Sequence, residues 1–146
     1  MSGSPGLSVY IASFSIKYPR NHGRLEGVPN FMFDCRAVKN PGRLDEYRPL
    51  SGLDAPVAAY LDQEESAASF YEDVKRLTDP ALAKAIERAY PAFRVWFACT
   101  GGRHRSVYFA ERLARDLERN AGVSCRVEHL DIGSNYSVDD LDPGRA

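Results

Sequence analysis

The segment 93–130 holds the pattern that most constrains the fold. Residues 93–99 form an almost unbroken apolar run, which is typical of a strand buried on both faces of a sheet. A glycine pair ends the run, and residues 105–120 then place apolar side chains at helical spacing. Residues 124–130 alternate and predict another strand. We expect a strand–helix–strand unit with parallel strands and a right-handed crossover.

The rest of the chain extends this unit into an α/β layered domain. Further strands are predicted at 7–16 and 30–36, and helices at 53–61, 66–77 and 79–90. The last two helices are separated because Thr78 or Asp79 followed by Pro80 is typical of a helix start. Interleaved strands and helices predict one domain over residues 1–146, with a mostly parallel or mixed sheet of about four to five strands and helices on both faces. Its core is expected at about 7–131, followed by a flexible tail at 132–146.

Composition limits the kind of ligand and the compartment. The formal net charge is −1, whereas general polyanion binders are strongly basic, so an anion site in this chain has to be local. Cys35, Cys99 and Cys125 form neither a disulfide framework nor a zinc motif, and no metal or cofactor is expected. Without a secretory leader or a long apolar run, the chain is expected to be cytoplasmic, with no membrane partner.

The loop at 98–106 has the chemistry of an anion site. A helix that starts directly after a buried strand presents free N–H groups and the positive end of its dipole, and phosphate binds readily there. Glycines let the backbone approach the anion, arginine offers two parallel donors, and hydroxyl groups add more. The candidate ligand residues in this loop are Cys99, Thr100, Gly101, Gly102, Arg103, His104, Arg105 and Ser106.

Cys99 and Arg105 also have the C-x5-R spacing of the cysteine phosphatases, followed by Ser106. A thiolate at a helix start beside arginine would be an activated nucleophile. The alternative is that Cys99 is a small buried side chain in the pocket wall. Ala98 stands where these phosphatases usually carry histidine, and Asp34 or Asp131 would have to serve as the general acid. Both interpretations stay open, and the balance is against an enzyme.

A second polar cluster follows the predicted strand at 30–36. It contains Asp34, Arg36, Lys39 and Asn40. Ligands of open α/β sheets lie at the carboxyl ends of the strands, so Asp34 and Asn40 could bind sugar hydroxyls and Arg36 a phosphate. The alternative is an ion pair beside an asparagine turn.

Together the two clusters resemble the C-terminal domain of the RNase adapter protein RapZ family. The resemblance covers about residues 30–131. The matching segments are Phe33-Asp34-Cys35-Arg36, Asn40-Pro41, the run 48–54, and the run 99–108 followed by Ala110-Glu111.

This resemblance implies a phosphofructokinase-like α/β layer that senses glucosamine-6-phosphate and contributes to RNA binding in full-length proteins. By position, Asp34, Arg36 and Asn40 would contact the sugar. Thr100, Gly101, Gly102, His104 and Arg105 would hold the phosphate, and Cys99 would be part of the wall.

Two features of this sequence differ from the family pattern. The family's GxxxxGKS nucleotide loop is not found in this chain, and residues 131–146 are acidic where the RNA-binding members are basic. We expect a binding module for a phosphosugar or a similar small anion, either as a stand-alone domain or as part of a different fusion. A cysteine phosphatase and an RNA-binding adapter are the alternatives, and a homodimer is left open.

Overall fold

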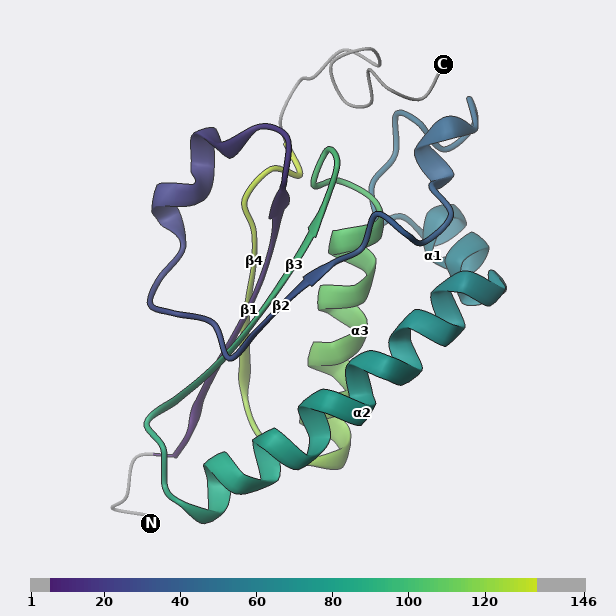
Figure 1. Cartoon of the computed structure of the whole chain (residues 1–146). Coiled ribbons are helices and arrows are strands. Elements are labelled where there is room, and N and C mark those ends of the chain that lie inside the picture. Colours follow the sequence, from purple (N-terminus) through teal and green to yellow (C-terminus); the bar gives the residue numbers. More distant parts are fainter. Residues whose placement is uncertain (1–5, 134–146) are drawn as a thin grey trace.

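A parallel sheet forms the centre of the molecule in the computed structural model, which describes residues 6–133. The strands are β1 (Ser8–Ser15), β2 (Phe31–Asp34), β3 (Ala92–Cys99) and β4 (Cys125–His129). They form a four-stranded sheet in the order β2-β3-β1-β4, and every neighbouring pair is parallel (Figure 1). The predicted single α/β domain is confirmed.

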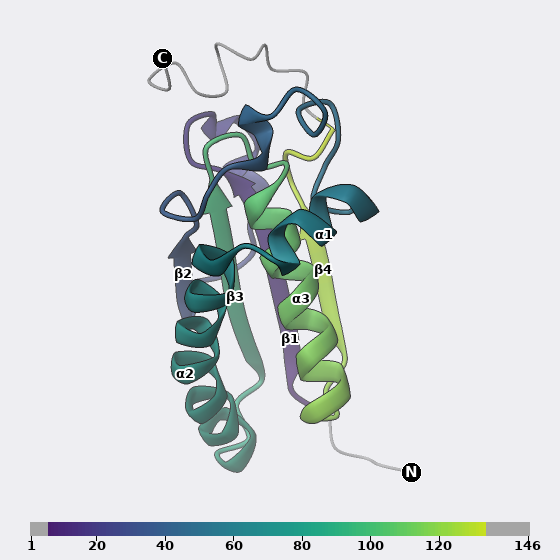
Figure 2. The ribbon, with the colours of Figure 1, turned by 90° about the vertical axis from the view of Figure 1, so that its right-hand side faces the viewer.

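The helices divide unequally between the two faces of the sheet. They are η1 (Pro19–Arg24), η2 (Pro41–Arg43), α1 (Ala55–Asp62), α2 (Glu65–Glu87) and α3 (Arg105–Asn120), where η denotes a 3-10 helix. Figure 2 shows α2 and α3 side by side over one face. Within residues 6–133 the opposite face carries no α-helix. The helices predicted for both faces are represented on that side by the short η1 and its flanking loop (Figure 1).

This arrangement follows from the direction in which each connection moves across the sheet. The connections from β2 to β3 and from β3 to β4 move toward the β4 edge, through helices on one face. The connection from β1 to β2 moves toward the other edge. Because parallel crossovers are right-handed, connections that move in opposite directions must cross opposite faces. The two sets of connections therefore diverge between β1 and β3, which is the topological switch point of the sheet.

The core lies between the sheet and the α-helices. Phe109 of α3 is fully buried and contacts Phe70 of α2 and Phe97 of β3, with ring centroids 4.9 and 6.3 Å away. A smaller apolar cluster around Phe14 and Leu130 lies on the opposite face. Within the described part of the chain, no helix combines the length and apolar character needed to cross a membrane.

The predicted break near Asp79 is wrong, because α2 continues through Pro80. The buried positions Val74, Thr78 and Leu82 keep one helical face on both sides of the proline. Packing of this face compensates for the hydrogen bond that proline cannot make. Thr78 Oγ1 donates to the carbonyl of Val74 at 2.9 Å, so this threonine lies within the helix and does not cap a new one. Of the predicted tail, residues 134–146 lie outside the described part of the chain.

Candidate anion-binding site

A pocket of about 560 Å³ opens at the carboxyl ends of β1, β2 and β3. Ile16 and Lys17 follow β1, the segment 36–40 follows β2, and Thr100 and Arg105 follow β3. The pocket therefore lies at the switch point between β1 and β3, where open α/β sheets bind their ligands. Its volume is in the range of small-molecule sites.

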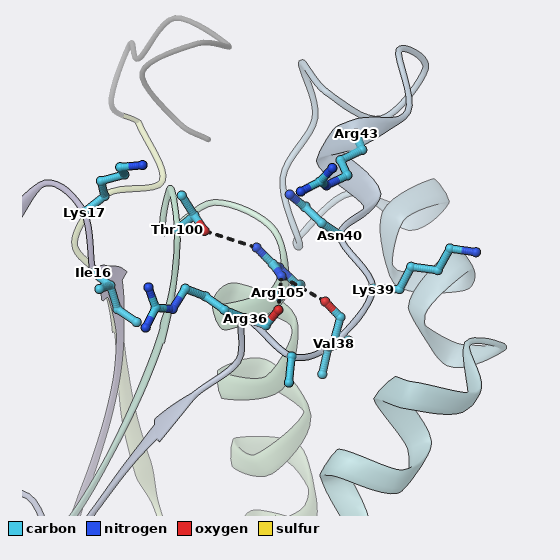
Figure 3. A pocket seen from close by; sticks show the side chains of 10 residues that line it. Ile16, Lys17, Arg36, Val38, Lys39, Asn40, Arg43, Thr100 and Arg105 are labelled. Atoms are coloured by element: carbon cyan, nitrogen blue, oxygen red, sulfur yellow. Dashed lines mark hydrogen bonds between the residues drawn. The ribbon is translucent and has the colours of Figure 1, made fainter. Parts of the chain in front are cut away.

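Arg105 is the central side chain of this pocket. It is the first residue of α3, it lines the pocket, and only 5% of its surface is exposed. Its Nη1 donates to the carbonyl oxygens of Arg36 and Val38 at 3.0 and 2.9 Å, and Nη2 reaches Thr100 Oγ1 at 3.5 Å (Figure 3). Arg105 Nε is buried without a partner. The guanidinium thus joins the segment after β2 to the loop after β3.

Within residues 6–133, the buried charge of Arg105 is not neutralised by a direct ion pair. Both Nη1 acceptors are neutral carbonyl groups, and Thr100 offers a neutral hydroxyl. The hydrogen bonds from Arg36 are the main cause that lowers the pKa of Asp34, and the nearby charge of Arg105 lowers it further. Asp34 therefore lies close enough to Arg105 to interact with its charge. A buried cation without a paired anion is costly, so an anion bound in the pocket would be strongly stabilised.

Cations surround the pocket on both sides of Arg105. Lys17 and Arg36 lie on one side and Arg43 on the other, next to Asn40, whereas the Lys39 ammonium points away (Figure 3). Five of the 19 lysines and arginines therefore line this one pocket, and within residues 6–133 no aspartate or glutamate does. The positive charge is local, as the net charge of −1 requires.

Asp34 and Arg36 form an ion pair beside the pocket. Arg36 Nη2 donates to Asp34 Oδ2 at 2.8 Å, and Nε reaches both carboxylate oxygens. The Arg36 N–H also donates to Asp34 Oδ1 at 2.9 Å. These contacts hold the pKa of Asp34 below its ordinary value. Arg36 lines the pocket and Asp34 does not, and the Asp34 carboxylate holds the Arg36 guanidinium at the edge of the pocket.

Cys99 points into the core at the end of β3. It is 2% exposed, packs with the main apolar cluster and does not line the pocket. Its thiol donates to Ser106 Oγ at 3.1 Å, and the Ser106 N–H donates to Cys99 Sγ at 3.4 Å. The Cys99 thiol is therefore held against Ser106, on the core side of the strand end.

The other residues predicted in this loop make structural contacts and do not line the pocket. Gly102 has a φ of +72° and packs against the end of β1. His104 is 7% exposed, and its Nε2 lies 3.0 Å from the Tyr47 carbonyl. Arg103 Nη2 donates to the Pro49 carbonyl at 3.1 Å. Gly101 is half-buried beside them.

The start of α3 is therefore partly covered. A Cβ on Gly52 would lie 2.4 Å from the His104 carbonyl oxygen and 2.7 Å from the Tyr108 nitrogen. The segment around Gly52 thus packs directly on the first turn of the helix. Arg105, the first residue of this helix, still lines the pocket.

Ile16 and Lys17 were not among the site residues predicted from the sequence. Both follow β1 and come to the pocket because β1 pairs with β3 over its whole length. Lys17 follows a segment that was predicted as a strand, so the switch-point rule could have identified it once the strand order was known. Within residues 6–133 no group of three or more His, Cys, Asp or Glu could hold a metal ion.

Comparison with known proteins identifies the family to which the chain belongs. The RapZ C-terminal domain matches residues 7–133 of this chain. The chain belongs to the RapZ C-terminal domain family. A nucleotide-binding protein of Neisseria meningitidis serogroup B is 40% identical over 116 residues, which is 77% of this chain and 38% of that protein. A nucleotide-binding protein of Acidiphilium cryptum is 35% identical over 135 residues, which is 90% of this chain and 42% of that protein.

The chain thus spans about 40% of the length of the curated relatives it matches. Nucleotide binding is stated of those longer proteins. The matched region contains the whole sheet and the three strand ends that form the pocket.

Proposed function

We propose that this RapZ C-terminal domain binds a small phosphorylated metabolite and does not transform it. The observation that carries the proposal is Arg105, a buried guanidinium that lines the pocket and has no direct carboxylate partner among the residues that the structure describes. The family resemblance suggests a phosphosugar, with glucosamine-6-phosphate as the first compound to test.

The phosphate would occupy the part of the pocket bounded by Arg105, Thr100 and Lys17. Arg105 supplies a charge that is already positioned, Thr100 a hydroxyl, and Lys17 a flexible ammonium group. Charge-assisted hydrogen bonds of this kind are roughly twice as strong as neutral ones. The remaining volume, beside Arg36 and Asn40, would take the sugar.

Titration calorimetry with glucosamine-6-phosphate and inorganic phosphate tests the proposal, using Arg105→Met. Loss of a charged hydrogen-bond partner costs about 1.5–3 kcal/mol, so the Kd should rise roughly 10- to 100-fold. Arg76→Gln is the matched control, because Arg76 pairs with Asp73 on the surface of α2 and its side chain is 73% exposed.

If Arg105→Met fails to fold, Lys17→Gln provides the same test at an exposed pocket position. A folded wild-type protein that gives no heat with any phosphosugar would refute the proposal. Unchanged affinity in both pocket variants would show that the ligand binds elsewhere.

The non-catalytic part of the proposal rests on Cys99, whose thiol is buried against Ser106 and does not line the pocket. Cys99→Ala should therefore leave the Kd for a bound phosphosugar within about 2-fold. An aryl phosphate should show no turnover above that of buffer. Turnover by the wild type that disappears in Cys99→Ser would instead establish the phosphatase.

A further inference from the structure

One buried serine joins the two loops that would hold the phosphate. Ser15 is the last residue of β1 and is fully buried. Its hydroxyl donates to the Thr100 carbonyl at 2.6 Å and accepts a hydrogen bond from the Tyr18 N–H at 3.0 Å. Thr100 follows β3, and Tyr18 follows Lys17 in the loop after β1. The Ser15 hydroxyl thus connects the loops after β1 and β3, using both its donor and an acceptor.

Lys17 lies inside the turn that this serine closes. The hydrogen bond from the Tyr18 N–H to Ser15 Oγ spans Ile16 and Lys17, and both of these residues line the pocket. Serine side chains that bond to a nearby backbone N–H stabilise turns of this kind. Ser15 Oγ also holds the backbone of Thr100, whose side chain lies on the same side of the pocket as Lys17 (Figure 3). One hydroxyl therefore sets the position of Lys17 relative to Thr100.

The loop that carries Lys17 is also fixed at both of its ends. The Ser15 N–H donates to Asp131 Oδ2 at 2.7 Å, and Asn21 Nδ2 donates to Asp131 Oδ1 at 2.6 Å. The Asn21 amide donates in addition to the Leu130 carbonyl at 3.1 Å. The residues on either side of 16–20 are thus held by one carboxylate. Because the backbone of this loop is already restricted, less entropy is lost when its ammonium group meets an anion.

We propose that Ser15 is a positioning residue of the phosphate site, whose hydroxyl sets the place of Lys17 relative to Thr100 and Arg105. This inference rests on the proposed function and extends it to a residue that does not itself line the pocket. A phosphate bound there has to meet the Lys17 ammonium and the donors that follow β3 at the same time. The relative position of the two loops therefore decides how well both contacts form, and a preset position raises the affinity.

Ser15→Ala removes the hydroxyl and leaves the backbone hydrogen bond to Asp131 in place. In titration calorimetry with glucosamine-6-phosphate, the variant should raise the Kd roughly 3- to 10-fold, because the loop that carries Lys17 must then be ordered on binding. Ser13→Ala is the matched control. Ser13 is also a fully buried serine of β1, but its hydroxyl lies 2.6 Å from His129 Nδ1, and neither residue lines the pocket. Its Kd should stay within about 2-fold of the wild-type value.

Lys17→Gln separates a positioning role from a general effect on stability. Once the ammonium group is absent, the position of its loop no longer matters, so adding Ser15→Ala to Lys17→Gln should change the Kd by less than about 2-fold. Unchanged affinity in Ser15→Ala, an equal loss in Ser13→Ala, or an equal loss in the two backgrounds would overturn the inference and leave the proposed function standing. Failure of the wild type to bind would remove the proposed function itself.

Hydrogen exchange of the Tyr18 amide tests the inference without any variant. In the ligand-free protein this amide should exchange at least about 10-fold more slowly than in an unstructured peptide, because Ser15 Oγ accepts its hydrogen bond. Exchange at the peptide rate before ligand is added would show that the loop is not preset by Ser15. That result would overturn the inference even if Ser15→Ala failed to fold.

Discussion

Gly102 holds the loop after β3 against the end of β1. Its φ is +72°, and a Cβ there would lie 2.7 Å from the Ser15 nitrogen and 2.9 Å from Asp131 Cβ. The Ser15 N–H donates to Asp131 Oδ2 at 2.7 Å in the same place. Gly102, which the sequence also predicted to hold the phosphate, thus allows the close approach of three strand ends.

Gly102→Ala should destabilise the protein by about 2–4 kcal/mol, because left-handed backbone conformation and steric overlap act together. Gly122→Ala is the matched control. Gly122 has a φ of +68° and nothing within 4 Å of the added Cβ, so only the conformational cost of about 1 kcal/mol applies. Urea unfolding measures both. Equal losses in the two variants would show that the contact with β1 is unimportant.

His104 makes stability depend on pH. Burial is the main cause that lowers its pKa below the ordinary 6.5. As the pH falls through 6.5, the unfolded chain binds a proton that the folded protein does not, so the free energy of unfolding decreases. The decrease continues down to the pKa of the folded state, with a slope of at most about 1.4 kcal/mol per pH unit.

Urea unfolding between about pH 7.5 and about pH 5.5 tests this, since most carboxylates stay ionised there. His104→Gln should show a shallower loss of stability than the wild type over this interval. Parallel pH profiles would assign the dependence to other groups.

Among the elements, α2 is the one in which tertiary packing overrides a local sequence signal for a helix start. A polar residue followed by proline is typical of a helix start, yet α2 runs from Glu65 to Glu87 without a break. The apolar repeat on both sides of Pro80 had the same phase, and this was the signal for one helix. By contrast, the bounds of β3 and α3 were predicted to within one residue. In these elements the length of the apolar run, the helical spacing and the position of the glycine pair all indicate the same boundaries.

Pro80→Ala should therefore stabilise the protein. Pro80 is exposed in the interior of α2 and supplies no N–H to its helix, and proline costs about 3 kcal/mol relative to alanine in such a position. Partial relaxation of the helix around the proline reduces the expected gain to about 1–2 kcal/mol. Pro80→Gly should gain about 1 kcal/mol less than Pro80→Ala. A loss of stability in both variants, measured by urea unfolding, would show that the proline is accommodated without cost.

At the scale of the molecule, the sequence showed which strand ends carry polar groups and left open which of them meet. The loop after β3 and the cluster after β2 were recognised locally, and Arg36, Asn40, Thr100 and Arg105 do line one pocket. Lys17 lies at the pocket because the strand order β2-β3-β1-β4 places β1 next to β3. No local sequence pattern predicts this strand order. The carbonyl partners of Arg105 could not be predicted either, because every residue has a backbone carbonyl and the sequence does not show which of them accepts a hydrogen bond.

The partners of Arg105 also have a kinetic consequence. Its Nη1 is held by the carbonyls of Arg36 and Val38, so no carboxylate from residues 6–133 has to leave the guanidinium before a ligand enters. Association should be a single step whose observed rate rises linearly with ligand concentration. Lower ionic strength should raise kon more than it changes koff, because the surrounding cations attract the anion from solution. Stopped-flow fluorescence at two salt concentrations measures both rates, and a rate that saturates with ligand would reveal an opening step.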